Sequence, residues 1–225
     1  MKQKQKQKPK SPAPPVGREK QISSADRKRR WSLGLIVGLL GFLLYSNTLS
    51  HNYVLDDFSA IKENNIVRQG IDAIPEIFKT SYRQGYLSVK DGLYRPLSLV
   101  TYAIEWDYFP DQPGVSHFVN IALYAITGFL LFLTLCKLFS NHSFSTGAGW
   151  SELVAFIASL LFIVHPLHVE VVANIKSRDE IMCFLFIISS LLFILKYIDE
   201  GEKKFMFYSL LLFFLAFLSK ETAIT

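Results

Sequence analysis

The chain has 225 residues, half of them hydrophobic, and a formal net charge of +5. Before Trp31 lie 11 of its 24 Lys and Arg but only 2 of its 19 Asp and Glu, so the rest of the chain is net negative and nucleic-acid binding is not indicated. Dense Leu, Phe and Ile segments without a polar face argue against a soluble domain, whose helices show an apolar stripe opposed by charges.

Residues 1–30 form the first predicted unit, a basic tail. It contains the repeat KQKQKQKPK and several prolines and is poor in apolar residues, so it should be disordered. Its charges suit contact with anionic lipid headgroups. Because short basic segments beside a transmembrane helix stay on the cytoplasmic side, we expect the N-terminus in the cytoplasm.

Five apolar segments in residues 31–225 are predicted to cross the membrane. They cover residues 31–50, 117–138, 152–168, 180–197 and 205–219. The first two reach the roughly 20 residues that a crossing requires, and the others reach it only with flanking polar residues. A cleaved signal peptide is the alternative for the first segment, but its apolar stretch exceeds the usual ~7–15 residues, which favours a retained anchor. Cys136 and Cys183 fall inside the predicted spans and are interpreted as packing residues.

The sequence thus predicts an all-α polytopic membrane protein with a large extracytoplasmic first loop, residues 51–116. Alternation of the spans places residues 169–180 and the C-terminal residues on the same outer side. Within the loop we expect short amphipathic helices. One begins at Pro96, a favoured first helical residue, and has an apolar face that would suit the headgroup region. The residues of that face are Leu97, Val100, Thr101, Ile104 and Tyr108.

Polar and ionisable residues gather at the outer ends of the predicted spans. The clusters are Asp56-Asp57, Tyr94-Arg95, His165 with His168 and Glu170, Lys176-Ser177-Arg178-Asp179-Glu180, and Lys220-Glu221. Ionisable groups at a membrane need partners, so this gathering indicates a functional surface. Each cluster also has a simpler explanation: Asp caps helices, and Lys220 with Glu221 is an ordinary ion pair. His165 and His168 would bind a metal only with a third ligand, for which Glu170 or Asp179 is available.

Together the clusters belong to an ordered pattern. It runs N-x-Y-V-x-D-D-x-x-A-I-x-x-N, Y-R-P-L, S-H-F-x-N, H-P-x-H-x-E, S-R-D-E and S-K-E-T. The pattern resembles the GT-C membrane glycosyltransferases, and within them the group whose transmembrane domain is followed by tetratricopeptide repeats, which includes the O-mannosyltransferases that modify cadherins and many bacterial relatives. The resemblance covers residues 31–225. Because those enzymes have further transmembrane segments, we expect this chain to be an N-terminal fragment.

The resemblance implies transfer of a mannose-like hexose from a polyprenyl-phosphate sugar to a hydroxyl, on protein Ser or Thr, at the extracytoplasmic face. Asp56 would be the general base, with inversion at the anomeric carbon, and Asp57 would orient its surroundings. The residues expected at the donor phosphate are Arg95, Arg178, Lys220, His165 and His168. Further residues expected in the site are Tyr94, Glu170, Asp179 and Glu221. The sequence contains no phosphate-binding P-loop and no dinucleotide fingerprint, in agreement with a lipid-linked donor.

The expected partners are the lipid-linked sugar, an acceptor protein or glycan, and membrane lipids, with no nucleic acid. No cofactor is indicated with certainty, and a divalent metal stays an alternative. A bacterial inner membrane is preferred over the endoplasmic reticulum. The competing function classes are a transporter or channel, and a noncatalytic membrane scaffold. A transporter places charges near the middle of its spans, whereas here they lie at the ends, which favours an active site at the interface.

Overall fold

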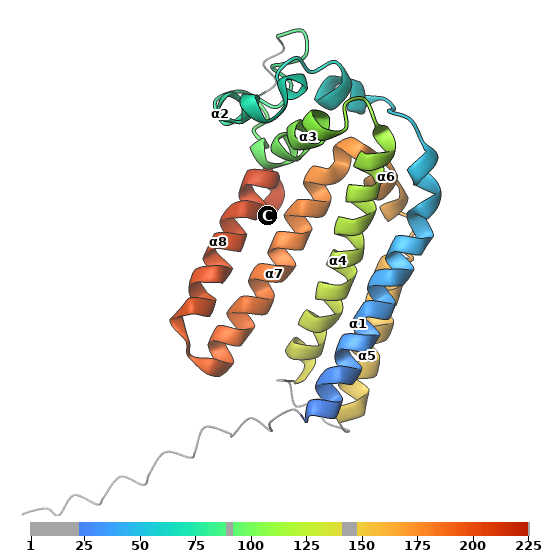
Figure 1. Ribbon diagram of the computed structural model, residues 1–225. Coiled ribbons are helices and arrows are strands. Elements are labelled where there is room, and N and C mark those ends of the chain that lie inside the picture. Colours follow the sequence, from blue (N-terminus) through green and yellow to red (C-terminus); the bar gives the residue numbers. More distant parts are fainter. Residues whose placement is uncertain (1–22, 89–91, 141–147, 225) are drawn as a thin grey trace, which may run out of the picture.

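The computed structural model describes residues 23–88, 92–140 and 148–224, and within these residues all regular structure is helical. Five long helices run side by side, and short helices gather at one end of them (Figure 1). The long helices are α1 (Ser24–Tyr45), α4 (Pro113–Ser140), α5 (Ala148–Ile163), α7 (Arg178–Glu200) and α8 (Lys203–Ser219). This arrangement confirms the predicted all-α membrane fold.

Three helical segments are long and apolar enough to cross a membrane, judged by length and composition. They are Ser24–Ser50, Pro113–Ser140 and Ile175–Glu200. Helices α5 and α8 coincide with predicted spans but have 16 and 17 residues, fewer than the roughly 20 that a perpendicular crossing needs. The chain is therefore an integral membrane protein, and the five-span topology stays a prediction.

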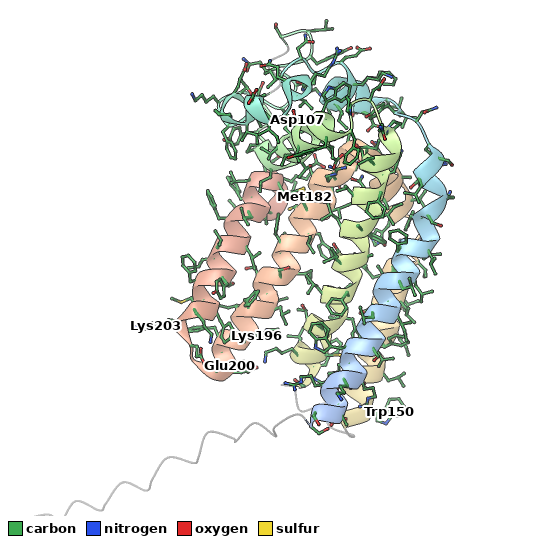
Figure 2. The ribbon with its side chains drawn as sticks, in the orientation of Figure 1. Asp107, Trp150, Met182, Lys196, Glu200 and Lys203 are labelled. Carbon is green, nitrogen blue, oxygen red and sulfur yellow. The ribbon has the colours of Figure 1, made fainter. Side chains whose placement is uncertain are left out.

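The two ends of the bundle differ in character. The loop end carries residues 46–88 and 92–112, the segment between α5 and α7, and the end of α8 with the residues up to 224 (Figure 1). The tail end carries the start of α1 and the connection between α7 and α8. Figure 2 shows Trp150, Lys196, Glu200 and Lys203 at the tail end and Asp107 at the loop end. The outer-side segments of the predicted topology thus lie at one end of the molecule.

Helix α1 begins earlier than predicted, at Ser24 instead of Trp31. The hydroxyl of Ser23 accepts a hydrogen bond from the N–H of Asp26 at 3.0 Å, and an acidic residue in the first turn suits the helix dipole. The prediction of disorder up to residue 30 was therefore wrong for residues 24–30. Residues 1–22 of the predicted tail lie outside the described residues.

Close helix packing depends on small residues. Gly34 and Gly38 of α1 are buried against α4, and Gly41 is buried against Ile163 of α5 and Tyr124 of α4. A Cβ atom at Gly38 would lie only 2.9 Å from the carbonyl oxygen of Ala125, so a larger residue would push the two helices apart. Such spacing of glycines allows backbones to approach closely in membranes.

Helices α7 and α8 form a hairpin joined by polar contacts. Gly201, which ends α7, has a left-handed φ of 70°, a conformation that favours glycine. The hydroxyl of Ser190 donates to the carbonyl oxygen of Ser209 at 2.8 Å, and the hydroxyl of Ser209 donates to the carbonyl oxygen of Ser190 at 3.0 Å. Reciprocal hydroxyl contacts of this kind hold helices together in lipid.

The described part of the large loop packs around a hydrophobic core that also includes Ile175, from the segment before α7. Helix α3 (Pro96–Tyr108) begins at Pro96 as predicted, and a short helix α2 (Ile74–Ile77) lies nearby. The face of α3 that packs into the loop core lies beside the apolar face that was predicted to suit the headgroup region. Leu99, Tyr102 and Ala103 are buried, whereas Ile104 and Tyr108 are exposed. The position of α3 in the headgroup region stays a prediction.

Candidate active site

The sequence motifs meet at the loop end through contacts between distant segments. Asp57 accepts a hydrogen bond from the N–H of Lys176, 119 residues away along the chain. Arg95 contacts both Asp179 and Glu221. Four of the predicted clusters are therefore joined to one another by polar contacts, as expected for one functional surface.

Asp56 and its neighbour have different environments. The Asp56 carboxylate is half-exposed, and its closest cation is Arg83, with Nη2 at 3.2 Å from Oδ2. Leu55, which precedes it, is exposed and has a positive φ of 45°, uncommon for a leucine. The Asp56 carboxylate is thus accessible at the surface of the described structure.

Asp57 is fully buried and ties two segments together. Its carboxylate accepts from the N–H of Val54 at 2.9 Å and from the N–H of Lys176 at 2.8 Å. Burial raises the pKa of Asp57 above its ordinary value, although both backbone hydrogen bonds act to lower it. Its contacts fit the predicted orienting role, because they fix the turn that carries Asp56.

Arg95 is nearly buried at the start of α3 and holds two carboxylates. Nη1 donates to Oδ2 of Asp179 at 2.7 Å, and Nε donates to Oε2 of Glu221 at 2.9 Å. Nη2 contacts the other oxygen of Glu221, so this pair is bidentate. The hydrogen bonds from Arg95 lower the pKa of Glu221 from 4.5 to about 2. Asp179 is fully buried, whereas Glu221 is half-exposed.

Arg178 is fully buried, and all five of its N–H donors are engaged within the protein. The acceptors are Asn120, Thr101, Ser116 and both carboxylate oxygens of Glu105. The guanidinium also lies 4.5 Å from the centre of the Tyr102 ring. For Arg178 to bind a phosphate as predicted, one of these partners would have to give way.

Lys220 is mostly buried, and its Nζ lies 2.6 Å from Oε1 of Glu180. Tyr94 is half-exposed and donates to the carbonyl oxygen of Phe78 at 3.0 Å, which attaches the Y-R-P-L segment to the end of α2. Both residues therefore lie at the loop end beside Arg95, but each has a partner of its own.

Of the two histidines of the H-P-x-H-x-E motif, His165 lies between α5 and α6 (His168–Ala173), and His168 is the first residue of α6. His168 Nδ1 is 2.8 Å from the hydroxyl of Tyr124, and the two histidine rings lie 5.8 Å apart. Glu170 is exposed in the first turn of α6, and Asp179 is bound to Arg95. Within the described part of the chain, no group of three or more His, Cys, Asp or Glu side chains is placed to hold a metal.

A pocket of about 200 Å³ opens beside His168. Its lining is mainly apolar and aromatic, with His168, Glu180 and Thr127 as polar groups. The remaining lining residues are Tyr124, Phe162, Val171, Ile181 and Phe184. Because it has few polar groups, such a pocket suits an apolar part of a ligand that lies next to a charged group of that ligand.

Sequence reasoning missed the buried partners of the site. Glu105, Tyr102 and Asn120 contact Arg178 or the turn before it. Asn120 belongs to the S-H-F-x-N motif, which was the available signal. Glu105 gave no signal, because a lone carboxylate on an amphipathic helix is usually a solvated residue.

Comparison with characterised proteins finds several relatives. The chain is 36% identical over 172 residues to protein O-mannosyl-transferase tmtc2 of Xenopus laevis, an alignment that covers 72% of this chain and 18% of that protein. It is 30% identical over 207 residues to protein O-mannosyl-transferase TMTC4 of Mus musculus, covering 85% and 28%. It is 31% identical over 197 residues to protein O-mannosyl-transferase TMTC1 of Homo sapiens, covering 81% and 21%.

The chain therefore spans less than a third of the length of these relatives. No family model and no solved structure matches it. These three relatives are vertebrate proteins and do not support the preference for a bacterial inner membrane.

Proposed function

Because the chain belongs to the family of protein O-mannosyl-transferases to which these relatives belong, we propose that it forms part of the active site of a membrane glycosyltransferase. The enzyme transfers a mannose-like hexose from a polyprenyl-phosphate donor to a hydroxyl, on protein Ser or Thr, with inversion. The reaction takes place at the extracytoplasmic face, with the N-terminus in the cytoplasm. Further transmembrane segments and helical repeats in the full-length protein complete the donor and acceptor sites.

The observation that carries the proposal is the pairing of an open carboxylate with a buried one at the loop end. Asp56 is half-exposed, while Asp57 beside it is buried and hydrogen-bonded to two backbone N–H groups. A general base must reach the acceptor hydroxyl, and a fixed neighbour keeps it in place. In this assignment Asp56 takes the acceptor proton as the hydroxyl oxygen attacks the anomeric carbon.

The departing phosphate gains negative charge and needs cations near it. Arg95 and Lys220 lie at the loop end and are assigned to this role, with His165 and His168 as additional hydrogen-bonding groups. Arg95 already holds a carboxylate in bidentate fashion, and the same fork suits a phosphate. Arg178 is not assigned to bind the donor phosphate, because its N–H donors are all engaged within the protein.

The test is sugar transfer by the full-length protein in lipid nanodiscs. Polyprenyl-phosphate mannose and GDP-mannose are offered separately, with a Ser/Thr-containing acceptor peptide. We expect transfer from the lipid donor alone, with opposite anomeric configurations in donor and product. Transfer from GDP-mannose would contradict the donor assignment. Absence of transfer from both donors, together with solute flux across sealed vesicles, would favour a transporter.

A further inference from the structure

The turn that carries Asp56 is attached to the bundle through Asp57. One oxygen of Asp57 binds the N–H of Val54 within the turn, and the other binds the N–H of Lys176 across the structure. Lys176 belongs to the 3₁₀ turn η4 (Ile175–Ser177), which directly precedes α7. The position of Asp56 therefore depends on the position of η4.

Two buried side chains also bind the η4 segment. The hydroxyl of Tyr102 on α3 donates toward the carbonyl oxygens of Ile175 and Lys176, at 2.8 and 3.2 Å. The side-chain amide of Asn120 on α4 donates to the carbonyl oxygens of Asn174 and Ile175, both at 3.2 Å. Tyr102 and Asn120 are buried, so these contacts are shielded from competing water.

Arg178 fixes both of these side chains. Its Nε donates to Oδ1 of Asn120 at 2.7 Å, and its guanidinium stacks 4.5 Å from the Tyr102 ring centre. Its other donors reach α3 at Glu105 and Thr101, and the start of α4 at Ser116. Arg178 thus connects α7 to α3 and α4 immediately after η4 in the chain.

We propose that Tyr102, Asn120 and Arg178 are positioning residues for the Asp56 base. They act through the carbonyl groups of η4 and through Asp57, and they do not touch the substrate. The inference rests on the proposed function, in which Asp56 takes the acceptor proton. Arg178 thereby has a role different from phosphate binding.

The test compares two buried tyrosines of the loop core. Tyr102→Phe removes the hydroxyl that holds η4 and keeps the ring against Arg178. Tyr82→Phe is the matched control: Tyr82 lies in the same core, and its hydroxyl finds no hydrogen-bond partner among the described residues. Tyr102→Phe should lower kcat roughly ten- to a hundred-fold, the scale expected when reacting groups are misplaced by about 1 Å. The KM for the donor should stay within about two-fold, since the donor contacts are unchanged.

A double-mutant cycle identifies the route of the effect. If Tyr102 acts through Asp57, the kcat of Tyr102→Phe combined with Asp57→Asn should be higher than the product of the single effects predicts. Independent, multiplicative effects would overturn the proposal. So would a kcat for Tyr102→Phe equal to that of Tyr82→Phe, even if Tyr102→Phe lowered the thermal stability.

Hydrogen exchange of residues 51–57 separates this inference from the proposed function, because it requires no sugar transfer. Tyr102→Phe and Asp57→Asn should each speed exchange in this segment several-fold, and Tyr82→Phe should not. Unchanged exchange in Tyr102→Phe overturns the linkage. If the variants exchange faster as expected but the wild-type protein transfers no mannose, the linkage between Tyr102 and this segment stands and the proposed function is refuted.

Discussion

The two ends of the helix bundle use the same chemistry in different ways. At the tail end, Glu152 of α5 binds Arg29 and Arg30 of α1, and an ion pair joins Lys137 of α4 to Asp199 of α7. Each of these ion pairs joins two helices. At the loop end, Arg95 joins the start of α3 to α7 and to the 3₁₀ turn η5 (Glu221–Ile224). Arg178 joins α7 to both α3 and α4.

The difference teaches where precise positioning is built into this fold. Two helices that already pack along their length need only a few ion pairs to fix their relative position, and the exposed fractions of these cations range from 16% for Arg30 to 55% for Arg29. A turn such as residues 51–57 has no hydrogen-bond ladder, so its place must come from side chains that reach it from several elements. Buried polar networks of that kind specify one arrangement, which is what an active site requires.

The first prediction tests whether the two ends lie on opposite sides of the membrane, and its outcome is all or none. In sealed vesicles with the cytoplasmic face outward, an impermeant maleimide should label Lys203→Cys at the tail end. It should leave Ser59→Cys at the loop end unlabelled until the membrane is opened. Background should be low, because the native Cys136 and Cys183 are buried. Equal labelling of both positions in sealed vesicles would refute the topology.

The second prediction concerns the two adjacent carboxylates at the loop end. Asp56→Asn keeps the shape of the side chain and removes the base, so kcat should fall by roughly 10²–10⁴-fold. The measurement is mannose transfer from the polyprenyl-phosphate donor, with membrane expression and donor binding measured in parallel. Both of these should stay close to wild type.

Asp57→Asn is the matched control, since its effect should appear in both kcat and thermal stability. One amide oxygen can still accept from a backbone N–H, but the second acceptor of the present geometry is lost. Near-normal transfer by Asp56→Asn beside complete loss in Asp57→Asn would make Asp57 the base.

The third prediction compares two losses in the free energy of unfolding. One follows removal of the buried Arg178 at the loop end, and the other follows removal of the Glu152 ion pairs at the tail end. Arg178→Met leaves the mostly buried Glu105 without its cation, and breaking a buried pair costs about 3–5 kcal/mol. Glu152→Gln frees Arg29, which is already half-exposed, and Arg30, which is mostly buried, and should cost less than Arg178→Met because water reaches Arg29. The free energy of unfolding in mixed micelles, followed during detergent titration, measures both. Equal losses would show that the two ends do not differ energetically.

Much of the fold follows from the sequence because apolar runs and basic flanks act locally. The runs located all five long helices, and alternation brought Asp56, Arg95 and Glu221 to one end before any contact was known. Sequence reasoning could not predict which side chains form hydrogen bonds and ion pairs with each other. Arg178 was predicted as a phosphate ligand, since a sequence does not show that Glu105 and Asn120 already use its donors. For the same reason the sequence left a metal pair and headgroup contacts as alternatives for His165 and His168, and did not show that His168 contacts the hydroxyl of Tyr124.

The last prediction concerns pH and has the smallest expected effect. The pKa of Glu221 is lowered to about 2 by its hydrogen bonds from Arg95. A carboxylate whose folded pKa lies below its unfolded value stabilises the protein above the unfolded pKa, and that contribution is lost as the pH falls through the folded pKa. The stability difference between wild type and Glu221→Gln should therefore be constant from neutral pH to about 5 and shrink between about 4.5 and 2.

The size of this difference should be modest, because the Glu221 side chain is 47% exposed and water screens the pair. An exposed ion pair contributes about 1 kcal/mol or less. Thermal unfolding of both proteins in an acid-stable detergent, at closely spaced pH values, measures the difference, and Glu202→Gln, from an exposed pair with Lys204 at the tail end, is the control. A difference that disappears near pH 6 would mean that Arg95 does not hold Glu221 as an ionised partner. Arg95 would then bind one carboxylate, Asp179, and the loop end would resemble the tail end more closely than its contacts indicate.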